Sequence, residues 1–233
     1  MRTALLFSGG KDSAYALLLN SNVDLLIGLT GRNGTQFHAG AETSEEFRRA
    51  QVALTGLPSR EIELPDKDYL RAMFSGLQRI VADEGITHLV TGDLWHPYSN
   101  GIGDALAAGL GVEIVRPGKE ICPGPEYGSE YVKRIIDSGI DARVTSVMEG
   151  VAPREWLGRK LDDRLLDEMR RLRIDPTGEG AEYQTAVVAG PMMRGKIVIM
   201  GYEAQRVPGR RYSQQFLRLD LTKWTIEPEI RLS

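Results

Sequence analysis

Residues 3–13 read TALLFSGGKDS, a short apolar run that breaks into a polar turn with paired glycines. A nearly continuous apolar run of this length is typical of a strand that is covered on both faces of a sheet. Residues 14–20, AYALLLN, predict a helix directly after the turn. The order of strand, glycine turn and helix therefore places residues 8–13 at the carboxyl end of the first strand of an α/β fold.

The rest of the first half repeats this alternation. Apolar runs predict strands at residues 24–30, 61–64, 87–91 and 112–115, and amphipathic stretches predict helices at residues 43–55, 68–83 and 97–109. Strands and helices that alternate at this spacing predict a doubly wound parallel sheet with right-handed crossovers. In residues 61–64 apolar and charged residues alternate, which places this strand nearer an edge of the sheet.

The character of the chain changes after Pro117. Turn residues recur from 117 to 128, and beyond them we expect a helix at 131–138, a strand at 141–148, a helix at 161–173 and strands at 185–188, 196–200 and 216–219. These later strands predict a smaller mixed or antiparallel sheet. We therefore expect two domains, residues 1–120 and a C-terminal α+β domain of residues 121–233.

The composition excludes several classes of protein. The chain has 233 residues, a formal net charge of −3 and 42% hydrophobic residues, which suffices for a sizeable core without a structural metal. Its single cysteine, Cys122, excludes an internal disulfide and argues against sulfur transfer, which usually needs a second thiol. The charge argues against direct binding of nucleic acid, and no apolar stretch is long enough for a membrane span. We expect a cytoplasmic protein.

The turn at residues 8–13 has the composition of a phosphate site. Gly9 and Gly10 have no Cβ, so their amides can face an anion, and the following helix adds unpaired N–H groups and the positive end of its dipole. The spacing differs from the Walker pattern GxxxxGK[ST] and from the dinucleotide pattern GxGxxG. A glycine turn without a ligand is the alternative. Ser8 and Ser13 add hydroxyls to this turn, and Lys11 adds an ammonium group. Asp12 adds a carboxylate, which is a candidate Mg²⁺ ligand.

A second polar stretch, residues 178–185, reads GEGAEYQT. It sets two carboxylates, an aromatic ring and a hydroxyl around glycines, which allow a substrate to approach the backbone. An exposed acidic turn that leads into a strand is the alternative interpretation. The candidate substrate-binding residues are Glu179, Gly180, Glu182, Tyr183 and Thr185.

The SGGKDS turn resembles the SGGxDS signature of the PP-loop ATP pyrophosphatases, which have an adenine nucleotide alpha hydrolase-like fold and cleave ATP between the α and β phosphates. Residues 178–185 look like the GEGGExET element of the diphthine–ammonia ligase family. Three further stretches resemble this family in the same order, so that the resemblance covers residues 1 to about 200: Gln36-Phe37-His38, Gly92-Asp93, and Trp156-Leu157-Gly158-Arg159 with Asp162.

This resemblance implies an ATP-dependent ligase that adenylates a carboxylate, releases pyrophosphate into the loop and transfers ammonia to the acyl group, leaving AMP. It implies ATP and Mg²⁺ as cofactors, free ammonia as the nitrogen source and diphthine on elongation factor 2 as the acceptor. The nucleotide site would add Thr30, His38 and Gly92 to the loop. The catalytic residues that we expect are Lys11, Asp12, Asp93 and Glu182.

The chain departs from the GEGGExET pattern at Ala181, which replaces a glycine, and at Gln184, which replaces an acid. These positions lie where the substrate would be recognised, so amidation of a different small carboxylate is an alternative. A non-catalytic adenine-nucleotide sensor is a second alternative. The acidic balance and the single cysteine argue against a tRNA thiolase or a lysidine-type synthetase. The tail after Gly201 is not covered by the resemblance, and a homodimer is left open.

Overall fold

The computed structural model describes residues 1–31, 45–65, 67–208 and 215–228. Its first sheet contains five parallel strands in the order β3-β2-β1-β4-β5. The order reverses between β1 and β4, and α/β folds bind ligands at the carboxyl ends of the strands at such a point. The strands are β1 (Thr3–Leu6), β2 (Leu25–Gly31), β3 (Ser59–Leu64), β4 (His88–Val90) and β5 (Glu113–Val115).

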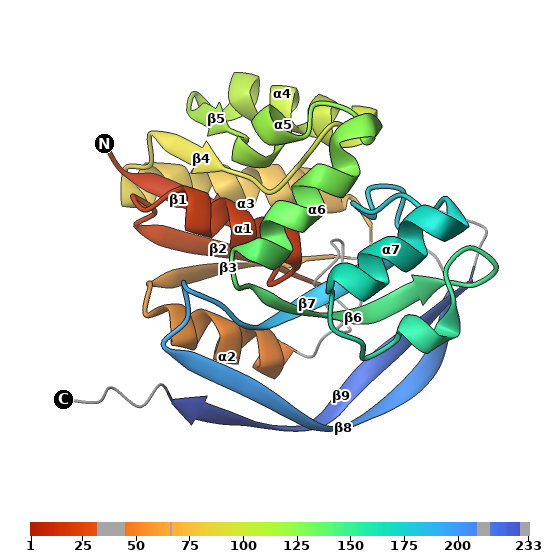
Figure 1. Ribbon diagram of the computed structural model, residues 1–233. Coiled ribbons are helices and arrows are strands. Elements are labelled where there is room, and N and C mark those ends of the chain that lie inside the picture. The colour runs from red at the N-terminus through yellow and green to blue at the C-terminus, as the bar shows by residue number, and fades with distance from the viewer. Residues whose placement is uncertain (32–44, 66, 209–214, 229–233) are drawn as a thin grey trace.

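Both faces of this sheet are covered by helices (Figure 1). Ala4 of β1 packs into a cluster with side chains of α3 (Tyr69–Glu84) and α4 (Pro97–Leu110). The next residue, Leu5, points to the opposite face, because side chains alternate along a strand. There it joins side chains of α1 (Lys11–Leu19) and α2 (Glu45–Thr55). The prediction of a doubly wound parallel α/β sheet is confirmed.

The second half forms an antiparallel sheet in the order β7-β6-β9-β8, which confirms the predicted C-terminal sheet. Two of its strands are 14 residues long and extend well beyond the apolar runs in the sequence, and most of the residues beyond those runs are exposed. In the described residues, no helix has the length and apolar character needed to cross a membrane. The elements are α6 (Gly128–Asp137), β6 (Asp141–Met148), α7 (Asp163–Leu172), β7 (Tyr183–Ala189), β8 (Gly195–Pro208) and β9 (Gln215–Pro228).

Three local predictions were wrong. The junction predicted as turns contains a helix, α5 (Pro117–Ile121), and a 3₁₀ turn at Pro125–Tyr127. Pro117 occupies the start of α5, where the missing N–H has no helical partner to lose. Helix α1 begins at Lys11 rather than at residue 14, so half of the glycine turn is helical. Helix α7 begins at Asp163, because Asp162 caps it.

The two sheets share one buried cluster. Phe7, which follows β1, Tyr131 of α6 and Val187 of β7 all belong to it. Helix α2 lies between the parallel sheet and the β8–β9 pair (Figure 1), and the ring of Phe47 meets that of Trp224 edge-on, with centroids 5.7 Å apart. The chain passes from one sheet to the other between β5 and β6. The division into residues 1–120 and 121–233 stays a prediction.

Candidate functional site

The loop at residues 8–13 stands at the carboxyl end of β1, where the strand order reverses. Gly9 has a φ of 79°, a conformation that favours glycine. The Ser8 hydroxyl accepts the Gly10 N–H at 3.3 Å and lies 3.1 Å from the Ser13 hydroxyl, which in turn donates to the Gly10 carbonyl at 3.1 Å. The result is a compact turn at a helix N-terminus, an arrangement suited to an anion.

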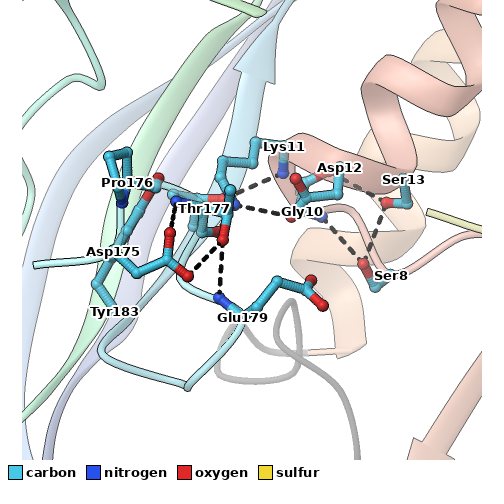
Figure 2. Close-up of polar contacts among 11 residues, drawn as sticks. Ser8, Gly10, Lys11, Asp12, Ser13, Asp175, Pro176, Thr177, Glu179 and Tyr183 are labelled. Carbon is cyan, nitrogen blue, oxygen red and sulfur yellow. Dashed lines mark hydrogen bonds and ion pairs between the residues drawn. The ribbon is translucent and has the colours of Figure 1, made fainter. Parts of the chain in front are cut away.

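The C-terminal sheet reaches this loop through β7 (Figure 2). Thr185 Oγ1 accepts the backbone N–H of Lys11 at 3.1 Å, although the two residues are 174 positions apart in the chain. Val187 donates its N–H to the Gly9 carbonyl at 2.9 Å. A Cβ on Gly10 would stand only 3.2 Å from the Thr185 carbonyl oxygen. The loop and the strand that follows the acidic turn are therefore in direct contact.

Lys11 is buried, and its ammonium is engaged within the protein (Figure 2). Nζ donates to Asp12 Oδ2 at 2.8 Å and to the Thr177 carbonyl at 2.5 Å, and it lies 5.3 Å from the centroid of the Tyr183 ring. Burial opposes the charged form of Lys11, but Asp12 and Tyr183 outweigh it and raise its pKa. Lys11 thus joins the start of α1 to the 177–183 segment and keeps a positive charge beside the loop.

Glu179 is the most strongly perturbed carboxyl group of the acidic turn. Burial is the largest cause that raises its pKa to about 8, and Asp12 and Asp93 add to the effect while Lys11 opposes it. Figure 2 shows the Glu179 side chain directed toward the side of the loop that carries Ser8. A carboxyl group with this pKa can hold or release a proton near neutral pH.

The turn before β7 is held by its own side chains. Asp175 accepts the N–H and the hydroxyl of Thr177 at 2.9 and 2.7 Å, and the Tyr183 hydroxyl donates to the Pro176 carbonyl at 2.5 Å. Ala181, at the position where the family pattern has a glycine, has a φ of 65°. A residue with a Cβ adopts this left-handed conformation at a cost of about 1–2 kcal/mol. The backbone of the turn is therefore constrained, not loosely exposed.

A cavity of about 450 Å³ opens beside this turn, a size suited to a small organic group. Burial raises the pKa of Glu182, and its Oε2 atom is buried without a hydrogen bond in the part of the chain that the structure describes. The cavity lies between the loop after β4 and the segment that leads into β7. Its lining residues are Trp95, His96, Pro97, Pro125, Arg173, Ile174, Asp175, Pro176, Gly180 and Glu182.

The other expected nucleotide residues differ in their distance from the loop. A Cβ on Gly92, after β4, would stand 2.8 Å from the backbone nitrogen of Ser13, so glycine allows the two segments to pack closely. Thr30, near the end of β2, donates its hydroxyl to the Ile62 carbonyl of β3 at 3.3 Å. His38 lies outside the described residues.

The sequence analysis missed two residues that contact this region. Gln51 of α2 is buried, and its Nε2 donates to the Gly9 carbonyl at 2.9 Å. Tyr131 of α6 is also buried, and burial together with the nearby Asp12 carboxylate raises its pKa. One signal was present in the sequence, because Gln51 stands four positions after Phe47 and therefore on the buried face of α2.

The Trp156–Arg159 stretch contacts the site through Tyr183. Trp156 Nε1 and Arg159 Nη1 both donate to Glu168 Oε2, at 3.1 and 2.8 Å. The Trp156 ring meets the Tyr183 ring edge-on, with centroids 6.2 Å apart. These contacts anchor α7 and Tyr183, and they do not involve the loop.

Asp12 is the candidate ligand for Mg²⁺ near the loop. In the described residues, no group of three or more His, Cys, Asp or Glu side chains is placed to hold a metal ion. Asp12 pairs through Oδ2 with Lys11, and its Oδ1 is buried with no hydrogen bond of standard geometry in the described chain. Mg²⁺ usually takes one or two carboxylates and completes its shell with phosphate oxygens and water. The donors therefore suit a magnesium ion that arrives with a nucleotide.

Comparison with known proteins adds two findings. Residues 128–214 match the family model of the diphthamide synthase C-terminal domain, a segment that contains the acidic turn and β7. The chain is 23% identical over 231 residues to the diphthine–ammonia ligase of the mouse, Mus musculus, an alignment that covers 88% of this chain and 85% of the mouse protein. The two findings confirm the resemblance to the diphthine–ammonia ligase family that is seen in the sequence.

Proposed function

We propose that this chain is an ATP-dependent ligase that adenylates a carboxylate and transfers ammonia to it, with diphthine on elongation factor 2 as the acceptor and the cytoplasm as its compartment. The name of the mouse relative describes a ligase of diphthine and ammonia. One observation carries the proposal: the Lys11 N–H lies 3.1 Å from Thr185 Oγ1. This contact brings together the two motifs of the resemblance, one suited to phosphate and one rich in carboxylates.

The phosphate side of the site would bind and polarise ATP. The backbone amides of the loop and the Lys11 ammonium stabilise the negative charge that grows on the departing pyrophosphate. Asp12 Oδ1 would hold a magnesium ion, which supplies charge neutralisation to the phosphates when it is bound. The loop is already shaped by contacts within the protein, so little reorganisation accompanies binding.

The acidic side of the site would orient the acceptor. From the cavity that Glu182 lines, the acceptor carboxylate attacks the α phosphate, and pyrophosphate leaves as the acyl-adenylate forms. Ammonia then attacks the acyl carbon, and the amide forms as AMP departs with loss of one proton. Glu179 is the group best suited to accept that proton, because its pKa of about 8 lies close to neutral pH.

The environment of Cys122 favours nitrogen transfer over sulfur transfer. Its thiol is buried, with Sγ 3.4 Å from the Gly124 carbonyl. Burial, followed by Asp175 and Glu179, raises the pKa of Cys122 to about 11. The thiol therefore stays protonated near neutral pH, and a protonated thiol is a poor nucleophile.

The test follows the products of ATP. The full chain is incubated with ATP, Mg²⁺, ammonium and elongation factor 2 that carries diphthine, and we expect equal amounts of AMP and pyrophosphate with conversion of the diphthine carboxylate to an amide, read by mass spectrometry. Elongation factor 2 without the modification is the matched control and should yield little AMP. ADP as the main product would contradict the proposal. Binding of ATP without turnover would favour the sensor, and amidation of only a small carboxylate would favour another acceptor.

A further inference from the structure

The orientation of the Gly9–Gly10 peptide decides which group the loop presents to a phosphate. The C=O and N–H groups of one planar peptide point in opposite directions. The Gly9 carbonyl lies against β7, where the Val187 N–H donates to it at 2.9 Å. The Gly10 N–H therefore faces the other way, toward Ser8 Oγ at 3.3 Å. Two adjacent glycines restrict this peptide little, so its orientation has to be held by other parts of the protein.

Gln51 donates a second hydrogen bond to this peptide. It is 1% exposed, and its Nε2 donates to the Gly9 carbonyl at 2.9 Å and to the Val187 carbonyl at 2.7 Å. A side-chain amide nitrogen carries two protons, so both are used. If the peptide flipped, the Gly9 carbonyl would lose both of its donors, and one N–H of Gln51 and the N–H of Val187 would be left buried without partners.

Helix α2 is itself fixed near Gln51. The buried Arg48, three positions earlier, donates through Nη1 to the Leu29 carbonyl of β2 at 3.0 Å and through Nη2 to Glu61 of β3 at 2.5 Å. On the other side, β7 is the edge strand of its sheet, and at Val187 this edge is paired with Gly9 and Gln51. Gln51 thus connects three parts of the molecule: the parallel sheet, the loop and the C-terminal sheet.

We propose that Gln51 is a positioning residue for the phosphate loop. It holds the Gly9 carbonyl against β7 and so keeps the Gly10 N–H, which donates to Ser8 Oγ, on the face of the loop where the phosphates would bind. It thereby makes phosphate binding in the N-terminal half depend on the C-terminal sheet. The inference rests on the proposed function for its ligands, ATP and pyrophosphate. Gln51 acts through Gly9 and does not itself contact the nucleotide.

The test compares two variants of α2. Gln51→Met keeps the shape of the side chain but removes both of its hydrogen bonds. We expect the dissociation constants of ATP and of pyrophosphate to rise about tenfold, because the Gly9 carbonyl loses one of the two buried hydrogen bonds that orient it. The affinity for AMP, which lacks the β and γ phosphates, should not change. Leu54→Ala is the matched control, because Leu54 is buried one turn further along the same helix. It should lower the melting temperature and leave all three affinities unchanged, as measured by calorimetry.

A second measurement needs no nucleotide. Hydrogen exchange of the amides in residues 8–13 should accelerate in Gln51→Met and not in Leu54→Ala, because only the former frees the Gly9–Gly10 peptide. Gln51→Asn, which keeps the amide but is too short to reach both carbonyls, should show the same losses and replaces Gln51→Met if that variant does not fold.

The outcomes separate this inference from the proposed function. If the wild-type protein binds neither ATP nor pyrophosphate, both are overturned. If the wild-type protein binds ATP and the Gln51 variants bind ATP and pyrophosphate equally tightly, only the role of Gln51 is overturned. Equal weakening of ATP and AMP would show a general structural effect, and it would overturn the positioning role as well.

Discussion

The phosphate loop and the acidic turn meet in one site, but they differ in how far their polar groups are paired within the protein. In the loop, the hydroxyls of Ser8 and Ser13 and the ammonium of Lys11 all have partners within the protein. In the acidic turn, burial raises the pKa values of Glu179 and Glu182, and one oxygen of Glu182 has no hydrogen bond in the described residues. The hydroxyls and the ammonium of the loop are paired before a ligand arrives, whereas the turn contains carboxylates that a ligand would satisfy.

This difference tells how each region should respond to substitution. The loop depends on shape, because its backbone is packed against β7 and its hydroxyls and ammonium are already paired. The turn depends on charge, because burying carboxylates without full partners is unfavourable and a ligand that supplies donors offsets that cost. Added atoms should therefore damage the loop most, and loss of a carboxylate should damage the turn most.

The largest effect should follow from adding atoms at Gly10. Its backbone is extended, so a larger residue is not excluded by φ, but a Cβ would stand 3.2 Å from the Thr185 carbonyl oxygen. Valine adds two further carbons beside Thr185 and Ser8, so the loop would have to shift, and we expect Gly10→Val to weaken ATP binding by about 100-fold or more. Calorimetry measures the effect, with Gly10→Ala as the smaller step. Unchanged ATP affinity in Gly10→Val would remove the loop from the nucleotide site.

Removing the carboxylate of Glu182 should impair the function of the acidic turn. We expect Glu182→Ala to reduce the rate of amidation on the order of 100-fold while ATP affinity stays nearly intact, because the cavity that Glu182 lines would hold the acceptor. Glu182→Gln, which keeps the shape without the charge, separates electrostatics from packing. A rate equal to that of the wild-type protein in both variants would assign Glu182 to an ordinary acidic turn.

The protonation state of Glu179 should affect how the free energy of unfolding depends on pH. Its pKa is about 8 in the folded protein against an ordinary value of 4.5, so between these pH values the folded state binds a proton that the unfolded state has lost. The free energy of unfolding should therefore fall as pH rises through this window. In Glu179→Gln the fall should be smaller. Denaturant unfolding at the two ends of the window, without nucleotide or magnesium, measures the slope, and equal slopes in both proteins would contradict the raised pKa.

The sequence predicted those features that depend on neighbouring residues. The TALLF run, the glycine turn and the helix after it are local patterns, and the alternation of strands and helices specifies a parallel sheet because parallel strands need crossover connections. The acidic turn was also visible as a local cluster. The neighbours of the acidic turn and its position beside the loop depend on how the two sheets pack, which local patterns do not specify.

The long-range contacts could not be predicted for that reason. Lys11 was expected to present a charge to phosphate, and nothing local indicates that its ammonium donates to the Thr177 carbonyl, 166 positions later in the chain. Gln51 stands on the buried face of α2, but its partners belong to the loop and to β7. A polar residue on the buried face of a helix indicates a buried hydrogen bond, but it does not identify the acceptor.

The smallest effect concerns the Trp156 stretch, which shares the family resemblance but lies behind the site. Asp162 accepts the Leu165 N–H at 2.9 Å and caps α7. We expect Asp162→Ala to lower the free energy of unfolding by about 1 kcal/mol, the usual contribution of such a cap, with ATP affinity and amidation rate unchanged. Denaturant titration and product assays measure both, with Asp163→Ala at the exposed neighbour as control. A lower amidation rate at unchanged stability would place this stretch in the reaction, and the contrast between a shape-dependent loop and a charge-dependent turn would then have to include a third region.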